Sequence, residues 1–268
     1  MNGPPLKIAM IGAAGRMGRR IVAGLDREMK LCGAIEYAEC PDLGKDAGVL
    51  AGVGPLNVAL TSDLEAGLQN AQVAIDFSTA EAAGDHARAC AGKGTPLVVG
   101  ITGLGQEAET ALRAAAEVIP VVWASNTSVG MNLLFRLVRQ AVAAMGEDCD
   151  IEIVEAHHRL KKDAPSGSAL SLARAAAEAR KTELERWATY GRQGLVGERP
   201  RGEIGIHAVR GGDIVGDHTV ILAHAGERLE LTHRAHSRDT FARGALRAAR
   251  FASEAAPGLY SMEDVLFA

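Results

Sequence analysis

Strands that alternate with helices dominate the first half of the chain, and this alternation restricts the possible fold more than any other feature. Apolar runs, each ending in a polar or glycine-containing turn, cover residues 7–11, 31–36, 73–79, 95–103 and 118–126. After the first run, Met17, Ile21 and Leu25 recur at helical spacing. Strands alternating with helices predict a parallel sheet with helices on both faces, which is a doubly wound, Rossmann-like α/β domain.

A glycine-rich turn joins the first expected strand to the first expected helix, and it reads Gly12-Ala13-Ala14-Gly15-Arg16-Met17-Gly18. Gly12 would allow a tight turn, Gly15 a close approach of the backbone to a pyrophosphate, and Gly18 close packing of the helix on the strand. Glu36 ends the second strand. Its spacing in the sequence from the glycine turn is that of an acidic residue that accepts hydrogen bonds from the ribose of a dinucleotide. Together these features favour a dinucleotide site over a tight turn without a ligand.

Ligands of doubly wound sheets bind beyond the carboxyl ends of the strands. The turns that follow the strands therefore predict a common rim, which consists of Gly12–Gly18, Glu36, Gly100–Thr102 and Ala124–Thr127. A bound nucleotide would lie along this rim.

The pattern changes after residue 128. Residues 129–145 show helical spacing, residues 151–156 indicate a strand, and residues 168–181 form an alanine-rich helical segment. Residues 203–236 then alternate between apolar and polar side chains, with hairpin signals at Gly211-Gly212 and at Ala225-Gly226-Glu227. We expect a second α+β domain here, built on a mixed or antiparallel sheet.

The chain is thus expected to form two domains. Residues 1–128 and 239–268 would form the dinucleotide-binding domain, because the last helix returns to it. Residues 129–238 would form the substrate-binding domain.

The stretch HHRLKKDAPSGS, residues 157–168, contains side chains suited to proton transfer and anion binding. Histidine is suited to general acid catalysis at neutral pH, and Lys161 adds a positive charge for a carboxylate. Ser166, Gly167 and Ser168 would open the next helix, whose N-terminus favours anions. The stretch predicts a pocket for a carboxylate-bearing substrate that accepts a proton.

Two other interpretations of this stretch are a metal site and a solvated loop. Adjacent histidines do not place two ligands on one face, which disfavours a metal site. Solvated loop histidines beside a salt-bridged Lys-Lys-Asp cluster are the more ordinary alternative. The Ser-Gly-Ser helix start and the glycine turn upstream favour the catalytic interpretation.

Charge and composition limit the partners and the compartment. A net charge of −4 gives no basis for a nucleic-acid or membrane partner. No apolar run approaches the ~20 residues that a membrane helix needs. The four cysteines have no metal-binding spacing and are expected to be buried and reduced. We expect a cytoplasmic protein.

Several segments resemble the 4-hydroxy-tetrahydrodipicolinate reductase (dihydrodipicolinate reductase) family, in the family's order and over nearly the whole chain. The most specific is EAHHRLKKDAPSGSA; the others include KIAMIGAAGRMGR, VAIDFSTAEA, VVGITGL, ASNTSVGMN and GDIVGDHTV. The resemblance implies a nucleotide-binding domain and a mixed-sheet domain, with a homotetramer assembled through that sheet. It implies hydride transfer from NADH or NADPH to a cyclic imine dicarboxylate, giving tetrahydrodipicolinate.

The resemblance also implies roles for individual residues. His157 would be the proton donor and Lys161 its catalytic partner. His158, Gly167 and Ser168 would hold the carboxylates of the substrate. The cofactor would be lined by Gly12, Ala13, Ala14, Gly15, Arg16, Met17, Glu36, Gly100, Ile101, Thr102, Ala124, Ser125, Asn126 and Thr127. No metal is implied.

The chain departs from the family pattern at a few of these positions. Tyr37 follows Glu36 where many members carry an arginine suited to the 2′-phosphate of NADPH, so the choice between NADH and NADPH stays open. Thr127 replaces an aromatic residue, Ile101 a threonine, and Ser168 a threonine. Two alternatives remain: another NAD(P)-dependent dehydrogenase of a small carboxylate, and a redox sensor that binds NAD(P)H without turnover.

Overall fold

The computed structural model describes residues 3–268 and divides into two compact units. Unit 1 comprises the residues up to Val129 and those from Arg238 onward, and unit 2 comprises Gly130–Ser237. Each unit has its own sheet and its own apolar core. No helix within residues 3–268 is long and apolar enough to cross a membrane.

The sheet of unit 1 has seven strands, all parallel, in the order β12-β6-β5-β4-β1-β2-β3. They are β1 (Leu6–Ile11), β2 (Met29–Ile35), β3 (Leu60–Thr61), β4 (Val73–Asp76), β5 (Leu97–Val99), β6 (Pro120–Trp123) and β12 (Gly258–Tyr260). The order 3-2-1-4-5-6 is that of a dinucleotide-binding doubly wound sheet, here extended by β12. The predicted Rossmann-like sheet is confirmed.

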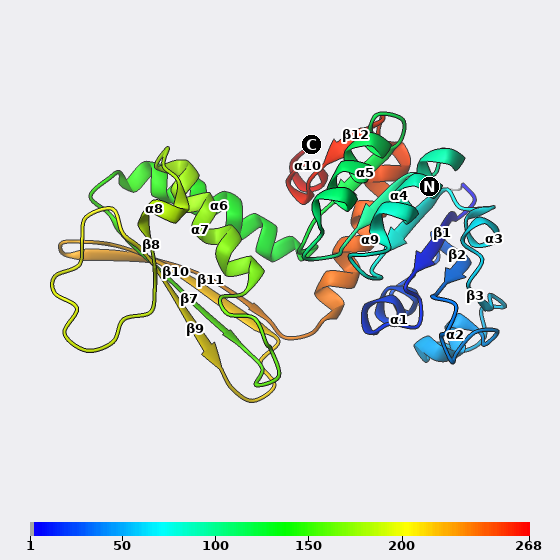
Figure 1. Ribbon diagram of the computed structural model, residues 1–268, viewed down its shortest axis with the longest axis horizontal. Coiled ribbons are helices and arrows are strands. Elements are labelled where there is room, and N and C mark those ends of the chain that lie inside the picture. Colours follow the sequence, from blue (N-terminus) through cyan, green and yellow to red (C-terminus); the bar gives the residue numbers. More distant parts are fainter. Residues whose placement is uncertain (1–2) are drawn as a thin grey trace. The chain divides into compact units, whose positions relative to one another are not determined.

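Helices cover both faces of this sheet (Figure 1). One face carries α3 (Leu64–Leu68), α4 (Ala83–Lys93) and α5 (Gln106–Ala116). The other carries α1 (Arg16–Ala23), α2 (Ala47–Ala51), α9 (Asp239–Glu254) and α10 (Met262–Phe267). Side chains of β1 alternate accordingly: Ile8 and Met10 join the core under α1 and α9, and Ala9 and Ile11 join the core under α4 and α5.

The sheet of unit 2 has five strands in the order β11-β10-β7-β9-β8. They are β7 (Asp150–His157), β8 (Ala188–Tyr190), β9 (Ile204–Arg210), β10 (Gly216–His224) and β11 (Glu227–Ala235). The central strand β7 is antiparallel to β10 and parallel to β9. The predicted mixed sheet is therefore confirmed. The helices of this unit are α6 (Val129–Met145), α7 (Gly167–Ala179) and α8 (Leu184–Trp187).

One of the two predicted hairpins is wrong. Strands β10 and β11 are paired neighbours joined at Ala225-Gly226, as the sequence predicts. The strands on either side of Gly211-Gly212, however, are not paired, because β7 lies between β9 and β10. The Gly211 N–H donates to the His157 carbonyl (2.9 Å), and the Arg159 N–H donates to the Gly212 carbonyl (3.2 Å). The diglycine turn thus binds the end of β7 and does not close a hairpin.

Side chains alternate along β7, so Glu155 and Glu152 lie on opposite faces of the strand. Ile151 and Ile153 face the core formed with α6 and α7. Glu155 and His157 continue along this same face, because side chains two residues apart on a strand share a face. Glu152 lies on the opposite face. The catalytic candidates therefore stand at the end of a core-facing row of side chains.

Candidate functional site

The glycine turn of unit 1 is tightly packed and suits a dinucleotide. Gly12 has a φ of +79°, and a Cβ added there would come within 2.9 Å of the Phe77 carbonyl oxygen. A Cβ on Gly18 would lie 2.1 Å from the Gly12 carbonyl oxygen. Helix α1 can therefore pack this closely against the turn only if residue 18 is glycine. Helix α1 begins after Gly15, and no side chain of the described residues caps it. Its first N–H groups and its dipole therefore suit a pyrophosphate.

A cavity of about 440 Å³ lies beside this turn, within the usual size range of small-molecule sites. Its walls come from the glycine turn, the end of β2 and the segment after β4, and they include Gly12, Gly15, Glu36, Tyr37, Phe77, Ser78, Thr79 and His86. The Ala14 N–H donates to Oε1 of Glu36 (2.7 Å), which fixes this carboxylate at the mouth of the turn. Mostly apolar walls with one carboxylate fit an adenosine group.

The remaining rim residues follow β5 and β6. Gly100 packs against Phe77, because a Cβ on Gly100 would lie 2.1 Å from the Phe77 ring. Ile101 is buried and Thr102 is exposed. Ala124, Ser125 and Asn126 follow β6, whose end lies at the same edge as the end of β1.

Thr127 occupies a different position from the rest of this rim. Its side chain is buried, and its hydroxyl donates to the Phe241 carbonyl of α9 (2.7 Å). The hydroxyl is therefore turned into unit 1. Only the backbone of Thr127 remains for the predicted contact with a cofactor.

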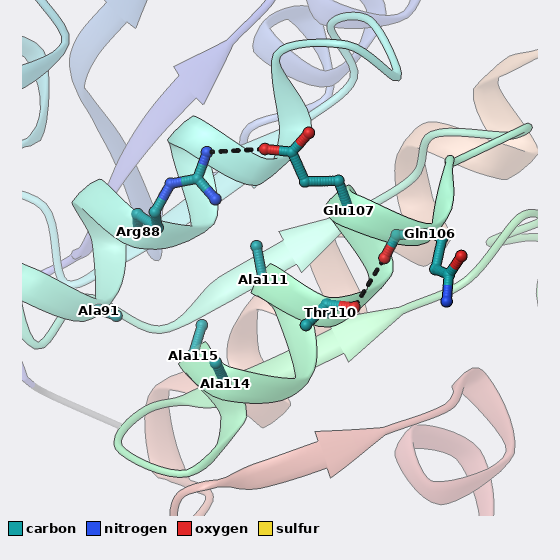
Figure 2. Close-up of a pocket in the computed structure, with 8 residues that line it drawn as sticks. All are labelled: Arg88, Ala91, Gln106, Glu107, Thr110, Ala111, Ala114 and Ala115. Carbon is teal, nitrogen blue, oxygen red and sulfur yellow. Dashed lines mark hydrogen bonds and ion pairs between the residues drawn. The ribbon is translucent and has the colours of Figure 1, made fainter.

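A second hollow of unit 1 lies between α4 and α5 (Figure 2). It is lined largely by alanine, with Arg88 and Glu107 at its rim, 3.8 Å apart. Thr110 is also in the lining, but its hydroxyl is used within α5, where it donates to the Gln106 carbonyl (2.8 Å). The hollow lies on the helical face of the sheet, away from the strand ends, and we do not include it in the candidate site.

In unit 2, His157 is bound to a fully buried carboxylate. Its Nδ1 lies 2.6 Å from Oε2 of Glu155, whose side chain is 0% exposed. Arg210 donates to both oxygens of Glu155, at 2.8 Å each. The Ser166 N–H donates to Oε1 (2.9 Å). Within residues 3–268, no protein group forms a hydrogen bond with Nε2 of His157, so this nitrogen can serve a substrate.

The surroundings of His157 disfavour its charged form. Burial lowers its pKa below the usual 6.5, although the hydrogen bond and the charge of Glu155 raise it. The ring of His218 packs edge-on against it, with the centroids 5.2 Å apart. Burial and the charge of His157 lower the pKa of His218 to about 4, so His218 stays neutral near pH 7. It does not compete for the proton.

The loop after β7 adds positive charge. Lys161 Nζ donates to both oxygens of Asp163, at 2.9 and 2.8 Å. Arg210 also donates to the Asp163 carbonyl (2.7 Å), so one guanidinium holds both Glu155 and the loop. Lys161 is 20% exposed and contributes positive charge at His157. The loop therefore combines a proton carrier with a nearby cation.

The start of α7 has groups that suit an anion. Ser166 caps the helix by accepting the Ala169 N–H (3.2 Å), and Gly167 and Ser168 form its first turn. The His158 Nδ1 atom is buried without a hydrogen-bond partner in the described residues. A helix N-terminus and an unsatisfied imidazole both suit a carboxylate. Within residues 3–268, no cluster of His, Cys, Asp and Glu could hold a metal ion.

Comparisons with known proteins agree along the whole chain. The family described as Dihydrodipicolinate reductase, N-terminus, matches residues 6–127, and Dihydrodipicolinate reductase, C-terminus, matches residues 130–266. The chain belongs to the dihydrodipicolinate reductase family. Membership confirms the resemblance and makes the chain an NAD(P)H-dependent oxidoreductase.

Individual relatives cover nearly the full length. The 4-hydroxy-tetrahydrodipicolinate reductase of Anaeromyxobacter dehalogenans is 49% identical over 97% of both chains. That of Alkalilimnicola ehrlichii is 50% identical over 97% of this chain and 98% of its own. A solved structure of dipicolinate-bound dihydrodipicolinate reductase from Paenisporosarcina sp. TG-14 has a TM-score of 0.77 at 24% identity. It covers 98% of this chain and 100% of that chain, and it supports the fold.

Sequence reasoning missed four residues around His157 in this reductase: Glu155, Arg210, Gly216 and His218. Glu155 could have been found, because it precedes His157 by two residues on a predicted strand and must share its face. The other three lie on β9 and β10, the two strands that pair with β7 in the sheet although they are distant from it in the sequence. No local signal in the sequence indicates that order.

Proposed function

We propose that the chain reduces 4-hydroxy-tetrahydrodipicolinate to tetrahydrodipicolinate with NADH or NADPH, in lysine and diaminopimelate biosynthesis. Loss of water from the hydroxylated substrate gives the dihydrodipicolinate imine. A hydride and a proton then reduce that imine, yielding tetrahydrodipicolinate and NAD(P)⁺. The observation that carries the proposal is His157: its Nδ1 is bound to buried Glu155 and its Nε2 is left for the substrate.

Unit 2 would bind and protonate the diacid. His157 would donate the proton from Nε2, and Lys161 would stabilise the negative charge that accompanies binding and reduction. His158, Gly167 and Ser168 would hold the carboxylates, supported by the position of α7 and the unsatisfied His158 Nδ1. A bound dicarboxylate would also raise the pKa of His157, because nearby negative charge favours the imidazolium.

Unit 1 would bind the cofactor, which supplies the hydride. The turn from Gly12 to Met17 would hold the pyrophosphate, and Glu36 the adenosine ribose. Gly100, Ile101, Thr102 and Ala124–Thr127 would lie along the nicotinamide half.

We propose that NADH serves at least as well as NADPH. Glu36 favours free ribose hydroxyls and repels a 2′-phosphate, and the next side chain, Tyr37, is 61% exposed and carries no positive charge. Changing Tyr37→Arg should raise kcat/KM for NADPH by about tenfold, the effect of one new charge-assisted hydrogen bond.

A homotetramer in the cytoplasm is part of the same proposal. It is supported by the face of the unit 2 sheet that α6 and α7 leave uncovered, where Val209 on β9 is exposed. Light scattering after size exclusion would give the mass of the assembly, and a monomer would refute this part.

Steady-state kinetics with enzymatically generated substrate test the activity directly. The oxidation of NADH and of NADPH is followed by absorbance in parallel reactions. We expect turnover that depends on the substrate, with kcat/KM for NADH equal to or above that for NADPH. Absence of turnover with both cofactors would refute the function and favour a sensor that only binds NAD(P)H.

A further inference from the structure

We propose that Glu155 is a positioning residue that fixes the ring of His157 through Nδ1 and so directs Nε2 to the substrate. This inference rests on the proposed function, because it assumes that His157 is the proton donor. Glu155 itself touches no substrate in this account. It acts only through the histidine.

The hydrogen bonds of Glu155 leave it no freedom to turn. An ionised carboxylate has about four lone-pair sites. The carboxylate accepts four hydrogen bonds: one from His157, two from Arg210 and one from the Ser166 N–H. Because the acceptor is fixed and fully buried, the imidazole ring bound to it is fixed as well.

The same contacts define which nitrogen carries the transferable proton. An ionised carboxylate only accepts hydrogen bonds, so Nδ1 must donate to Glu155 and keep its proton. Nε2 is then the nitrogen that can be charged and discharged. Gly216 leaves space beside it, because a Cβ added there would lie 3.1 Å from Nε2.

The charges around His157 predict the direction of a pH effect. Glu155 on β7 raises its pKa, whereas burial and the charges of Lys161 in the loop and Arg210 on β9 lower it. His158 is its neighbour in the chain, His218 on β10 is neutral, and Asp163 is paired with Lys161. Glu155 is thus the anion in direct contact, and removing its charge must lower the pKa of His157 further.

The sign for catalysis follows from this direction. A general acid works in its protonated form, so kcat falls as the pH rises through the pKa of His157. In Glu155→Gln, this alkaline fall should move to lower pH by about one unit or more. At neutral pH, kcat should fall about 10- to 100-fold, as is typical when the partner of a reacting group is removed.

Glu152→Gln is the matched control. Glu152 lies on the same strand and is also bound by arginine and histidine side chains, but on the opposite face. The control should lose stability and keep both kcat and its pH profile. Glu155 would be merely structural if Glu155→Gln behaved in the same way, with a lower Tm and an unchanged alkaline limb.

A second variant covers the case in which Glu155→Gln does not fold with Arg210 unpaired. Glu155→Gln/Arg210→Gln removes both charges. Its alkaline limb should still lie below that of the wild type, because Glu155 affects the pKa of His157 more than Arg210 does. An alkaline limb at the wild-type position in this double variant would overturn the proposal.

An activity-independent readout separates this inference from the proposed function. NMR titration of isotopically labelled histidine gives the pKa of His157 in the wild type and in the variants. If the wild type fails to reduce the diacid, the proposed function fails, and the titration still decides the positioning role. A lower pKa of His157 in Glu155→Gln supports it, and an unchanged pKa refutes it.

Discussion

Strand β7 carries two carboxylates with similar partners on its two faces, and the comparison shows what makes one of them part of a site. Glu155 accepts hydrogen bonds from Arg210 and His157. Glu152 accepts hydrogen bonds from Arg192, Arg199 and His207. Each cluster even needs a glycine: a Cβ on Gly205 would lie 1.9 Å from a Glu152 oxygen, and Gly216 leaves space beside His157.

The difference between the clusters lies in their positions and in the histidine nitrogen that each uses. Glu155 is fully buried on the face that packs on α7, and His157 binds it through Nδ1, which leaves Nε2 for a substrate. Glu152 is 21% exposed on the other face, and His207 binds it through Nε2 (2.7 Å). We therefore propose that the pair on the α7 face serves catalysis, because its open nitrogen lies on the side of a helix start that suits an anion.

The largest difference should appear when the two histidines are compared. His157→Gln removes the proposed proton donor and should lower kcat by about 10²- to 10⁴-fold with little change in KM. His207→Gln should leave kcat nearly unchanged. Steady-state kinetics check both variants, and a kcat of His157→Gln within twofold of the wild type would remove this histidine from the mechanism.

The lysines of the loop give the next largest contrast. Lys161→Ala should lower kcat/KM by about 10- to 100-fold, which corresponds to one hydrogen bond to a charged group. Lys162→Ala is the control, because this neighbouring side chain is exposed and makes no contact that the mechanism uses. Equal kinetics of the two variants would show that Lys161 is only a surface charge paired with Asp163.

Acid stability separates the clusters in another way. Burial raises the pKa of Glu152, but hydrogen bonds from Arg192, His207 and Arg199 outweigh it and lower the pKa from 4.5 to about 2. The resulting stabilisation is complete above pH 4.5 and is lost as the pH falls toward 2. Glu152→Gln should therefore lower the free energy of unfolding at neutral pH by about 2 kcal/mol and flatten its decrease in acid.

Urea denaturation at neutral pH and at several acidic pH values measures this effect. Glu198→Gln is the control, because Glu198 is an exposed carboxylate of the same unit. A Glu152→Gln variant as stable as this control would contradict the account of the uncovered face. So would a loss of kcat like that of Glu155→Gln.

The smallest expected effect concerns the two glycines. Gly216→Ala places a methyl group 3.1 Å from Nε2 of His157, so the ring must shift by a few tenths of an ångström. We expect a few-fold loss of kcat, in line with the sensitivity of catalysis to small displacements. Gly205→Ala should lower Tm through overpacking against Glu152 and leave kcat unchanged. A loss of kcat in Gly205→Ala, with an unchanged kcat in Gly216→Ala, would contradict the roles assigned to the two faces of the sheet.

The sequence predicted the fold well because the signals for it are local. Apolar runs such as 7–11 and 118–126 lie within or around strands of the parallel sheet, and the glycine turn stands where it was expected. The hairpin at Gly211-Gly212 was wrong because the position of β7 between β9 and β10 is decided by distant pairing. Arg210 was missed for the same reason.

The tautomer of His157 in the wild-type protein tests the central claim most directly. Nitrogen NMR of labelled histidine distinguishes imidazoles protonated at Nδ1 from those protonated at Nε2. Above its pKa, His157 should carry its proton on Nδ1, with that proton in a hydrogen bond to Glu155, and should titrate below 6.5 in the absence of substrate. A neutral His157 protonated at Nε2, or one that titrates like an exposed histidine, would contradict the account.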